Sequence, residues 1–211
     1  MPTRAELKQA AKDRMKEQAI NPVLVTLVYM LVAIALSLVS GILGATVILP
    51  LVISIVSVFV EFGYLFYCMK VARREQGAYE DLAFCFKDWR FALKLFALSF
   101  VVGILTMLWS LLFVIPGVIK AISYSQAILI MIENPNMGIM DAIKESQKMM
   151  DGHKMEYFVL DLSFIPWVLL VSVTFGIASV WVVPYMQVTM ANYYYALKKP
   201  ADDGAKVVLE Y

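Results

Sequence analysis

Residues 108–120 read Leu-Trp-Ser-Leu-Leu-Phe-Val-Ile-Pro-Gly-Val-Ile-Lys, and this stretch decides the fold. One apolar run ends at Pro116-Gly117, and a second begins there and continues to Ile132. Proline breaks a helix interior but is accepted in the first helical turn, so the dipeptide predicts a tight turn between two helices. Two apolar helices joined in this way form a hairpin that a bilayer can hold.

The same pattern extends through the rest of the chain. Of its 211 residues, 61% are hydrophobic and 17% are charged, and residues 18–60, 95–119 and 162–197 contain no charge at all. Apolar runs of about 18 residues or more are typical of membrane helices, and runs of about twice that length with a central Gly or Pro predict hairpins. A large soluble helical core would instead show polar outer faces at helical spacing.

We therefore predict an all-α polytopic transmembrane helical bundle of six spans arranged as three hairpins. A membrane domain at 23–197 follows an N-terminal amphipathic helix at 1–22 and precedes a flexible cytoplasmic tail at 198–211. Gly41 and Gly44 mark the first turn, and Pro184 is expected to interrupt the last span. The predicted spans are 23–40, 46–69, 95–114, 116–132, 156–173 and 178–197.

Amphipathic or interfacial segments precede each hairpin. Residues 3–19 fit a helix whose first turn carries a capping box of Thr3 and Glu6. Segments 70–94 and 133–156 are predicted to lie at the interface, and within the second an amphipathic helix is expected at 138–151. Three such units could be a degenerate repeat, but residue identity between them is weak, and any six-helix protein needs cytoplasmic connectors.

The cations predict the orientation. Of the 18 Lys and Arg residues, all except Lys120 fall before residue 20, in the two interfacial segments, or in the tail. The positive-inside rule then places both termini in the cytoplasm of a multi-pass protein in a bacterial plasma membrane. The first 20 residues lack the apolar core of a cleavable signal peptide. Cys68 and Cys85 show neither a disulfide framework nor metal spacing and are interpreted as free thiols.

Two charged residues fall inside predicted spans. Glu61 precedes Lys70 by a stretch of helix about 13 Å long at 1.5 Å per residue, which places it near the membrane midplane. A charge at that depth costs about 2.5–3.5 kcal/mol and marks a candidate functional site. Lys120 has a flexible stem that could reach Glu61. The simpler alternatives are that Lys120 reaches outward to headgroups and that Glu61 is neutral.

Four more residues complete the candidate cavity. Tyr124 and Gln126 make the fourth span polar on more than one face, which predicts that other helices enclose it, as bundle contacts or as a cavity wall. Asp161 lies near the start of the fifth span, with Asn192 or the run Tyr193–Tyr195 as its simplest partner. That tyrosine run also suits an aromatic belt.

The 108–120 stretch with Ser-Tyr-Ser at 123–125 is accompanied by further motifs at Arg4–Lys8, Asp141–Ser146, Met150–Gly152, Leu162–Trp167, Thr174–Gly176 and Val183–Tyr185. Together these motifs resemble the DUF975 family of bacterial integral membrane proteins. The resemblance covers nearly the whole chain, and it implies location and fold but no biochemical activity. Pro166 stands where the family more often has Gly, and a looser similarity exists to the membrane domain fused to some glycerophosphodiester phosphodiesterases.

Two functions remain open from the sequence. The first is binding or moving a lipid-like or amphipathic molecule in a cavity lined by the candidate residues Glu61, Lys120, Tyr124, Gln126, Asp161 and Asn192. The second is a non-catalytic accessory or scaffold subunit that packs against another membrane protein or a second copy. We expect no enzyme activity, no cofactor or metal and no nucleic-acid partner, because no nucleotide-binding loop or Cys/His cluster is present.

Overall fold

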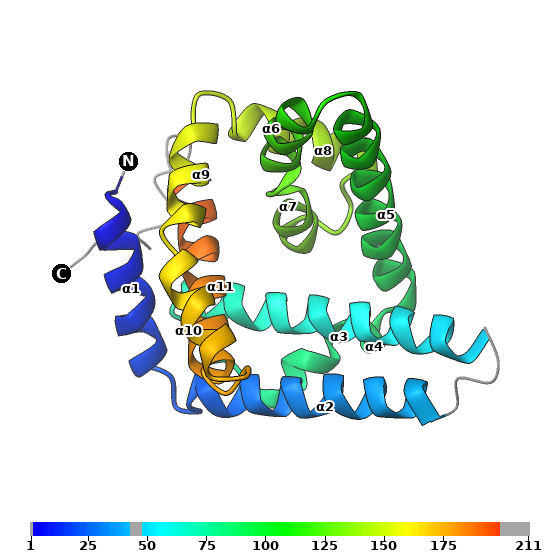
Figure 1. Cartoon of the computed structure of the whole chain (residues 1–211), viewed down its shortest axis with the longest axis vertical. Coiled ribbons are helices and arrows are strands. Elements are labelled where there is room, and N and C mark those ends of the chain that lie inside the picture. The colour runs from blue at the N-terminus through cyan, green and yellow to red at the C-terminus, as the bar shows by residue number, and fades with distance from the viewer. Residues whose placement is uncertain (1, 43–47, 199–211) are drawn as a thin grey trace.

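The computed structural model describes residues 2–42 and 48–198. Within these residues every regular element is a helix (Figure 1). The predicted turn residue Gly44, the expected helix start at Thr46 and the tail beyond Lys198 lie outside the described residues. The elements are α1 Arg4–Lys16, α2 Pro22–Ile42, α3 Ile48–Ala72, η1 Tyr79–Ala83, α4 Phe84–Lys87, α5 Trp89–Leu112, α6 Val114–Tyr124, α7 Ala127–Glu133, α8 Ile139–Met149, α9 Lys154–Leu162, α10 Ile165–Val173 and α11 Ser179–Lys198.

Five segments of the described chain are long and apolar enough to cross a membrane. The prediction of six spans is therefore not confirmed, because α11 is not among them. Its second half carries Asn192 and three consecutive tyrosines, which lower its hydropathy. The five segments are Pro22–Gly41, Pro50–Ala72, Trp89–Leu112, Val114–Glu133 and Lys154–Val173.

Helix α11 lies inside the molecule instead of on its apolar surface. It packs against α1, α2, α3 and α10, and nearly all of its second half is buried. Protein atoms therefore surround the polar side chains that made this helix unsuitable for lipid. The prediction that Pro184 interrupts the helix was wrong, since α11 runs through Pro184 without a break.

Two predicted spans are each broken into two helices. The fourth span divides at Ser125-Gln126 into α6 and α7, and the fifth divides at Ser163-Phe164 into α9 and α10. Proline at the second position of α10, Pro166, suits a helix start because no intrahelical partner is needed there. Each break frees backbone groups that require other partners.

The hairpins do not all run in the same direction. Helices α2 and α3 lie side by side, as do α5 and α6, whereas α10 and α11 have a smaller contact. In Figure 1 the α2–α3 pair crosses the view horizontally, while α5 and the α9–α10 helices run vertically. The structure therefore does not confirm the predicted arrangement of six spans as three hairpins.

Each connecting element packs mainly on the last helix of another hairpin. Elements η1 and α4 cover α3, α8 covers α6 and α7, and α1 covers α11. The contact of η1 with α3 is very close, because a Cβ atom added to Gly63 would lie 2.1 Å from the carbonyl oxygen of Leu82. Elements η1, α4 and α8 thus lie on helices that precede them in the chain, whereas α1 lies on the last helix.

Large apolar side chains cover much of the outer surface. Leu31 and Leu38 of α2 are 56% and 61% exposed, and the tip between α5 and α6 exposes Leu111 through Ile115. A soluble monomer rarely exposes contiguous apolar surface on this scale, so these faces suit contact with lipid.

Candidate functional site

A cavity of about 350 Å³ lies where α3, the α6–α7 break, α9 and α11 meet. Three of the six predicted site residues line it, namely Glu61 of α3, Gln126 at the break and Asp161 of α9. They come from distant parts of the chain. The other lining residues are Tyr29, Phe62, Tyr64, Leu65, Ser125, Ile128, Leu129, Tyr157, Val183, Met186, Gln187, Met190 and Ala191.

The two carboxylates of this cavity lack a cationic partner. Among the described residues, neither Glu61 nor Asp161 forms a hydrogen bond or an ion pair through its side chain. The expected partners of Asp161, Asn192 and the tyrosine run, bind other groups. Both side chains are exposed in the structure, but they lie on helices that are apolar enough to span a membrane. An ionised carboxylate facing lipid is costly without a partner, so the cavity is suited to a ligand that supplies a cation or hydrogen-bond donors.

Ser146 of α8 joins the two sides of the α6–α7 break. Its hydroxyl donates to the carbonyl oxygen of Ser123 at 2.8 Å and accepts from the backbone amide of Gln126 at 3.2 Å. Ser146 is fully buried, so the amphipathic helix α8 is part of the packed core at this point. The hydroxyl thus replaces hydrogen bonds that the broken helix cannot make for itself.

Only one of the two polar atoms of the Gln126 side chain forms a hydrogen bond. Its side-chain nitrogen donates to the Ser125 hydroxyl at 2.8 Å, while its side-chain oxygen is buried and has no hydrogen-bond partner. A buried acceptor without a partner costs about 1–3 kcal/mol. Gln126 as a residue lines the cavity, although this oxygen atom faces protein.

Lys8 of α1 contacts the break between α9 and α10. Its ammonium group donates to the carbonyl oxygen of Ser163 at 3.1 Å and lies 4.3 Å from the ring centroid of Phe164. Burial, followed by the charges of Arg4 and Lys12, lowers the pKa of Lys8. Both broken helices are therefore completed by a polar side chain from an amphipathic helix.

Lys120 does not reach the cavity. Its ammonium group lies 4.9 Å from the ring centroid of Trp109 on α5, and no ion pair with Glu61 forms. The suggested Glu61–Lys120 pair is therefore absent from the described residues, and a cation–π contact takes its place. Tyr124 is buried in the core and is not among the lining residues.

Asn192 belongs to a different group of residues. Its side-chain oxygen accepts a hydrogen bond from Arg14 of α1, which also donates to the carbonyl oxygen of Ala72 at the end of α3. Arg14 is 1% exposed. Burial lowers its pKa to about 10, and at neutral pH the guanidinium is therefore still charged. Asn192 thus fixes α1 to α11 and plays no part in lining the cavity.

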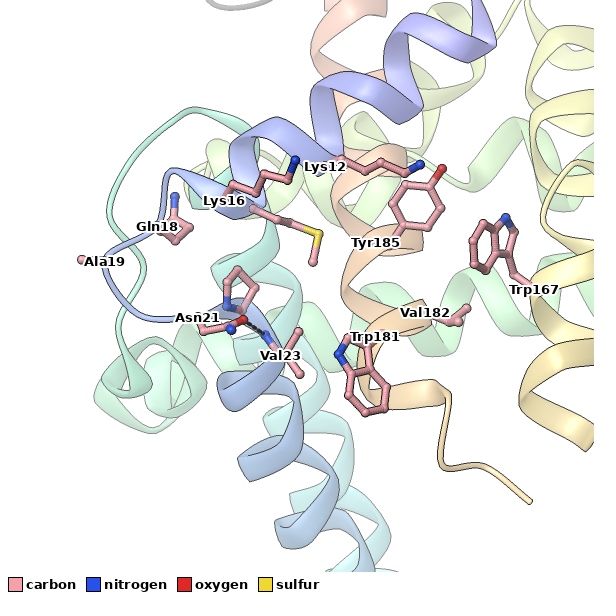
Figure 2. A pocket seen from close by; sticks show the side chains of 12 residues that line it. Lys12, Lys16, Gln18, Ala19, Asn21, Val23, Trp167, Trp181, Val182 and Tyr185 are labelled. Carbon is pink, nitrogen blue, oxygen red and sulfur yellow. Dashed lines mark hydrogen bonds between the residues drawn. The ribbon is translucent and has the colours of Figure 1, made fainter. Parts of the chain in front are cut away.

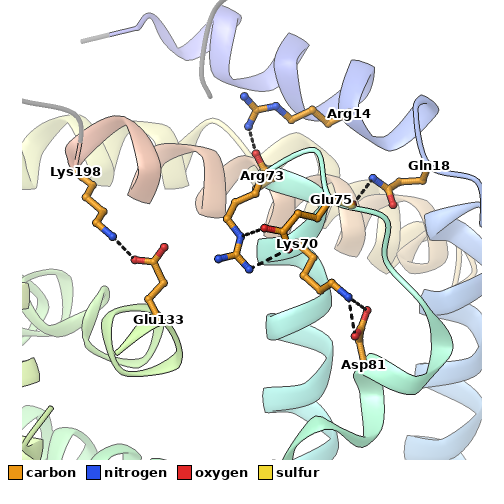
Figure 3. A network of polar contacts seen from close by, with 9 residues as sticks. Arg14, Gln18, Lys70, Arg73, Glu75, Asp81, Glu133 and Lys198 are labelled. Carbon is orange, nitrogen blue, oxygen red and sulfur yellow. Dashed lines mark hydrogen bonds and ion pairs between the residues drawn. The ribbon is translucent and has the colours of Figure 1, made fainter. Parts of the chain in front are cut away.

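A polar network around Arg14 secures the ends of several helices (Figure 3). Gln18 donates to the carbonyl oxygen of Glu75 at 3.0 Å and accepts from the amide of Gly77 at 2.9 Å. Lys70 binds Asp81 at 3.0 Å. These contacts clamp the loop after α3 between α1 and η1.

The tyrosine run does not form an aromatic belt. Tyr193, Tyr194 and Tyr195 are all buried, and the Tyr194 hydroxyl donates to the Glu133 carboxylate at 2.6 Å. Lys198 approaches the same carboxylate at 2.7 Å. The run therefore packs in the interior, because α1, α2 and α3 surround the helix that carries it.

Sequence reasoning missed Arg14 as a functional position, although a signal existed. Leu7, Ala11 and Arg14 recur at helical spacing on the buried face of α1, so one charge lies in an otherwise apolar row. A charge in such a row predicts a buried partner. Lys8 offered no comparable signal. The carbonyl oxygen of Ser163 is free to accept its hydrogen bond only because α9 ends there.

These features define a class of protein: an all-helical chain with several helices apolar enough to span a membrane, and with amphipathic helices packed into the bundle. The chain belongs to the family described as "Protein of unknown function (DUF975)", whose model matches residues 1–125 and 111–201. The expected family is thus confirmed. Neither the comparison with curated proteins nor the comparison with solved structures gives a match.

Proposed function

We propose that this protein binds or moves a lipid-like or amphipathic molecule through the cavity lined by Glu61, Gln126 and Asp161. The observation that carries the proposal is the convergence of two carboxylates without cationic partners on one cavity. Ionisable residues in apolar helices are costly, and they commonly mark ligand or ion pathways.

The lining divides into two parts that suit an amphipathic ligand. Glu61 and Asp161 offer acceptors for a cationic or hydrogen-bond-donating group. Leu65, Met186 and other apolar side chains offer surface for a hydrocarbon portion. A volume of about 350 Å³ is at the small end of the range for ligand cavities, so a headgroup fits better than a whole lipid.

The broken helix supports this interpretation. Membrane proteins tolerate interrupted helices where the freed backbone lies in protein or lines a cavity, and transporters place binding sites at such breaks. The α6–α7 break lies on the cavity wall through Ser125 and Gln126. A ligand here would contact the junction of two helical segments.

The test uses the protein reconstituted in vesicles and tetraphenylphosphonium as a lipophilic cation probe. Glu61→Gln and Asp161→Asn should each weaken binding about tenfold, because each removes a charged acceptor worth about 1.5 kcal/mol or more. Glu80→Gln is the matched control, because Glu80 is exposed, lies outside the cavity and makes no side-chain bond to a described residue. Lys120→Met should also bind normally.

The same experiment distinguishes the cavity proposal from the alternative of an accessory subunit. Unchanged probe binding in the double variant Glu61→Gln/Asp161→Asn would overturn the cavity proposal. A stoichiometric membrane partner recovered by cross-linking, and lost when apolar surface residues such as Leu31 are replaced, would support the scaffold instead.

A further inference from the structure

A second pocket of about 480 Å³ lies where the end of α1 meets the beginnings of α2 and α11, with α10 on its far side (Figure 2). It shares no lining residue with the acid-lined cavity. Its wall combines cations with aromatic and apolar side chains. The lining residues include Lys12, Lys16, Val23, Trp167, Trp181 and Tyr185.

The cations lie along one side of this pocket. Lys12 and Lys16 are one helical turn apart on α1, and both are exposed. Neither forms an ion pair within the part of the chain that the structure describes. The ammonium group of Lys12 lies 5.6 Å from the ring centroid of Tyr185. Two unneutralised cations at one rim create a local preference for an anion.

The opposite side of the pocket is apolar and aromatic. In Figure 2, Trp181 and Val23 lie below the lysines, and Trp167 lies beyond Tyr185. Trp181 remains 57% exposed and Trp167 36% exposed. Tryptophan favours the boundary between headgroups and hydrocarbon, because its ring is apolar and its N–H is polar. The pocket therefore changes from cationic to apolar in one direction, as a lipid does from headgroup to chain.

We infer that this pocket binds an anionic phospholipid, with its phosphate between Lys12 and Lys16 and an acyl chain against Trp181. Charge complementarity selects the occupant: the rim offers two cations, and no carboxylate is among the lining residues. Basic pockets between helices at a membrane surface are suited to anionic headgroups. This inference does not depend on the acid-lined cavity, whose charge has the opposite sign.

The experiment measures lipid selectivity in the reconstituted full chain. Spin-labelled phosphatidylglycerol and phosphatidylcholine are compared by the fraction immobilised on the protein. Lys12→Gln/Lys16→Gln should reduce the preference for phosphatidylglycerol on the order of tenfold, since each lysine near a membrane surface contributes appreciably to anionic-lipid binding. Lys12→Arg/Lys16→Arg should retain the preference, which excludes misfolding as the cause.

A matched control is available in α8. Lys144 and Lys148 are also exposed and one helical turn apart, so Lys144→Gln/Lys148→Gln makes the same change in net charge elsewhere. This control should keep its selectivity. An equal loss in both double variants would show only a general charge effect and would overturn the site.

The acyl chain is tested separately with phosphatidylglycerol brominated on its chains. Bromine quenching of tryptophan fluorescence should fall in Trp181→Phe, and Lys12→Gln/Lys16→Gln should lose the excess quenching that brominated phosphatidylglycerol shows over brominated phosphatidylcholine. Displacement of the lipid by millimolar inorganic phosphate would identify a phosphate site instead and would overturn the lipid proposal. Equal binding of both lipids to the unmodified protein would do the same.

Discussion

Arg14 donates a hydrogen bond from its guanidinium group to the side-chain oxygen of Asn192. This contact joins the first helix to the last and is buried on both sides. Because Arg14 also donates to the carbonyl oxygen of Ala72, one side chain connects α1, α3 and α11. A charged amphipathic helix is thereby fixed inside the bundle.

Removing the guanidinium should loosen that connection. Arg14→Leu leaves the acceptors of Ala72 and Asn192 without this donor, and we expect a loss of about 2–4 kcal/mol in the free energy of unfolding. Unfolding in mixed detergent micelles measures the change. Arg4→Gln serves as the control, because Arg4 is exposed and should cost less than about 0.5 kcal/mol.

The Asn192 side of the contact gives a reciprocal prediction. Asn192→Asp should cost less stability than Asn192→Leu, because the carboxylate still accepts from Arg14 and adds charge attraction, although it cannot replace the amide nitrogen that donates to the carbonyl oxygen of Leu7. Asn192→Leu should destabilise, and its effect combined with Arg14→Leu should be smaller than the sum of the two. Additive effects in this double-mutant cycle would show that the contact contributes nothing.

Ser146→Ala should weaken the α6–α7 break. The substitution removes both hydrogen bonds that cross the break, at a cost of about 1–3 kcal/mol, and should accelerate hydrogen exchange of the Gln126 amide. Ser172→Ala is the matched control, since that exposed hydroxyl bonds only within its own helix. Unchanged exchange at Gln126 would contradict the assigned role of Ser146.

Two glycines should respond in opposite ways to alanine. At Gly63 the new methyl group would lie 2.1 Å from the Leu82 carbonyl oxygen, so Gly63→Ala should separate η1 from α3 and cost about 1–3 kcal/mol. At Gly103, on α5, the added Cβ would have no atom within 4 Å apart from its chain neighbours and the backbone of its own helix. Gly103→Ala should be neutral or stabilise by up to about 1 kcal/mol. Thermal unfolding of both variants measures the difference, and equal effects would contradict the close packing of η1.

The native cysteines should resist labelling. Cys68 and Cys85 are both buried and free, and burial raises the pKa of the Cys85 thiol to about 11. Only the thiolate reacts, and at pH 9 about one Cys85 side chain in a hundred would be ionised. A membrane-permeant maleimide should therefore label the protein only after denaturation, whereas Glu80→Cys should label at once. Rapid labelling of the native thiols in the folded protein would contradict this packing.

Periodicity and turn residues predicted much of the local structure. The turn predicted at Pro116-Gly117 lies a few residues earlier, at Phe113, and both residues fall at the start of α6 instead. The capping box of Thr3 and Glu6 and the amphipathic helix near residues 138–151 occur where local chemistry placed them. These features depend on neighbours within one or two helical turns. The breaks at Ser125 and Ser163 were not predicted, since each depends on a partner far along the chain, Ser146 for one and Lys8 for the other.

Within the candidate site, the sequence identified Glu61 and Asp161 because charge is conspicuous in an apolar run. It could not show that they share a cavity while Lys120 and Asn192 do not, because that depends on how separate helices pack.

By itself, then, the sequence determined that the chain is helical, strongly apolar and a DUF975 member, since those properties follow from residue type, spacing and motif. Only the tertiary structure decided that α11 is enclosed by protein, that α1 is anchored through Arg14, and that two carboxylates meet at one cavity. The physical reason is that burial and hydrogen bonding between distant helices are settled by packing, which no local pattern encodes.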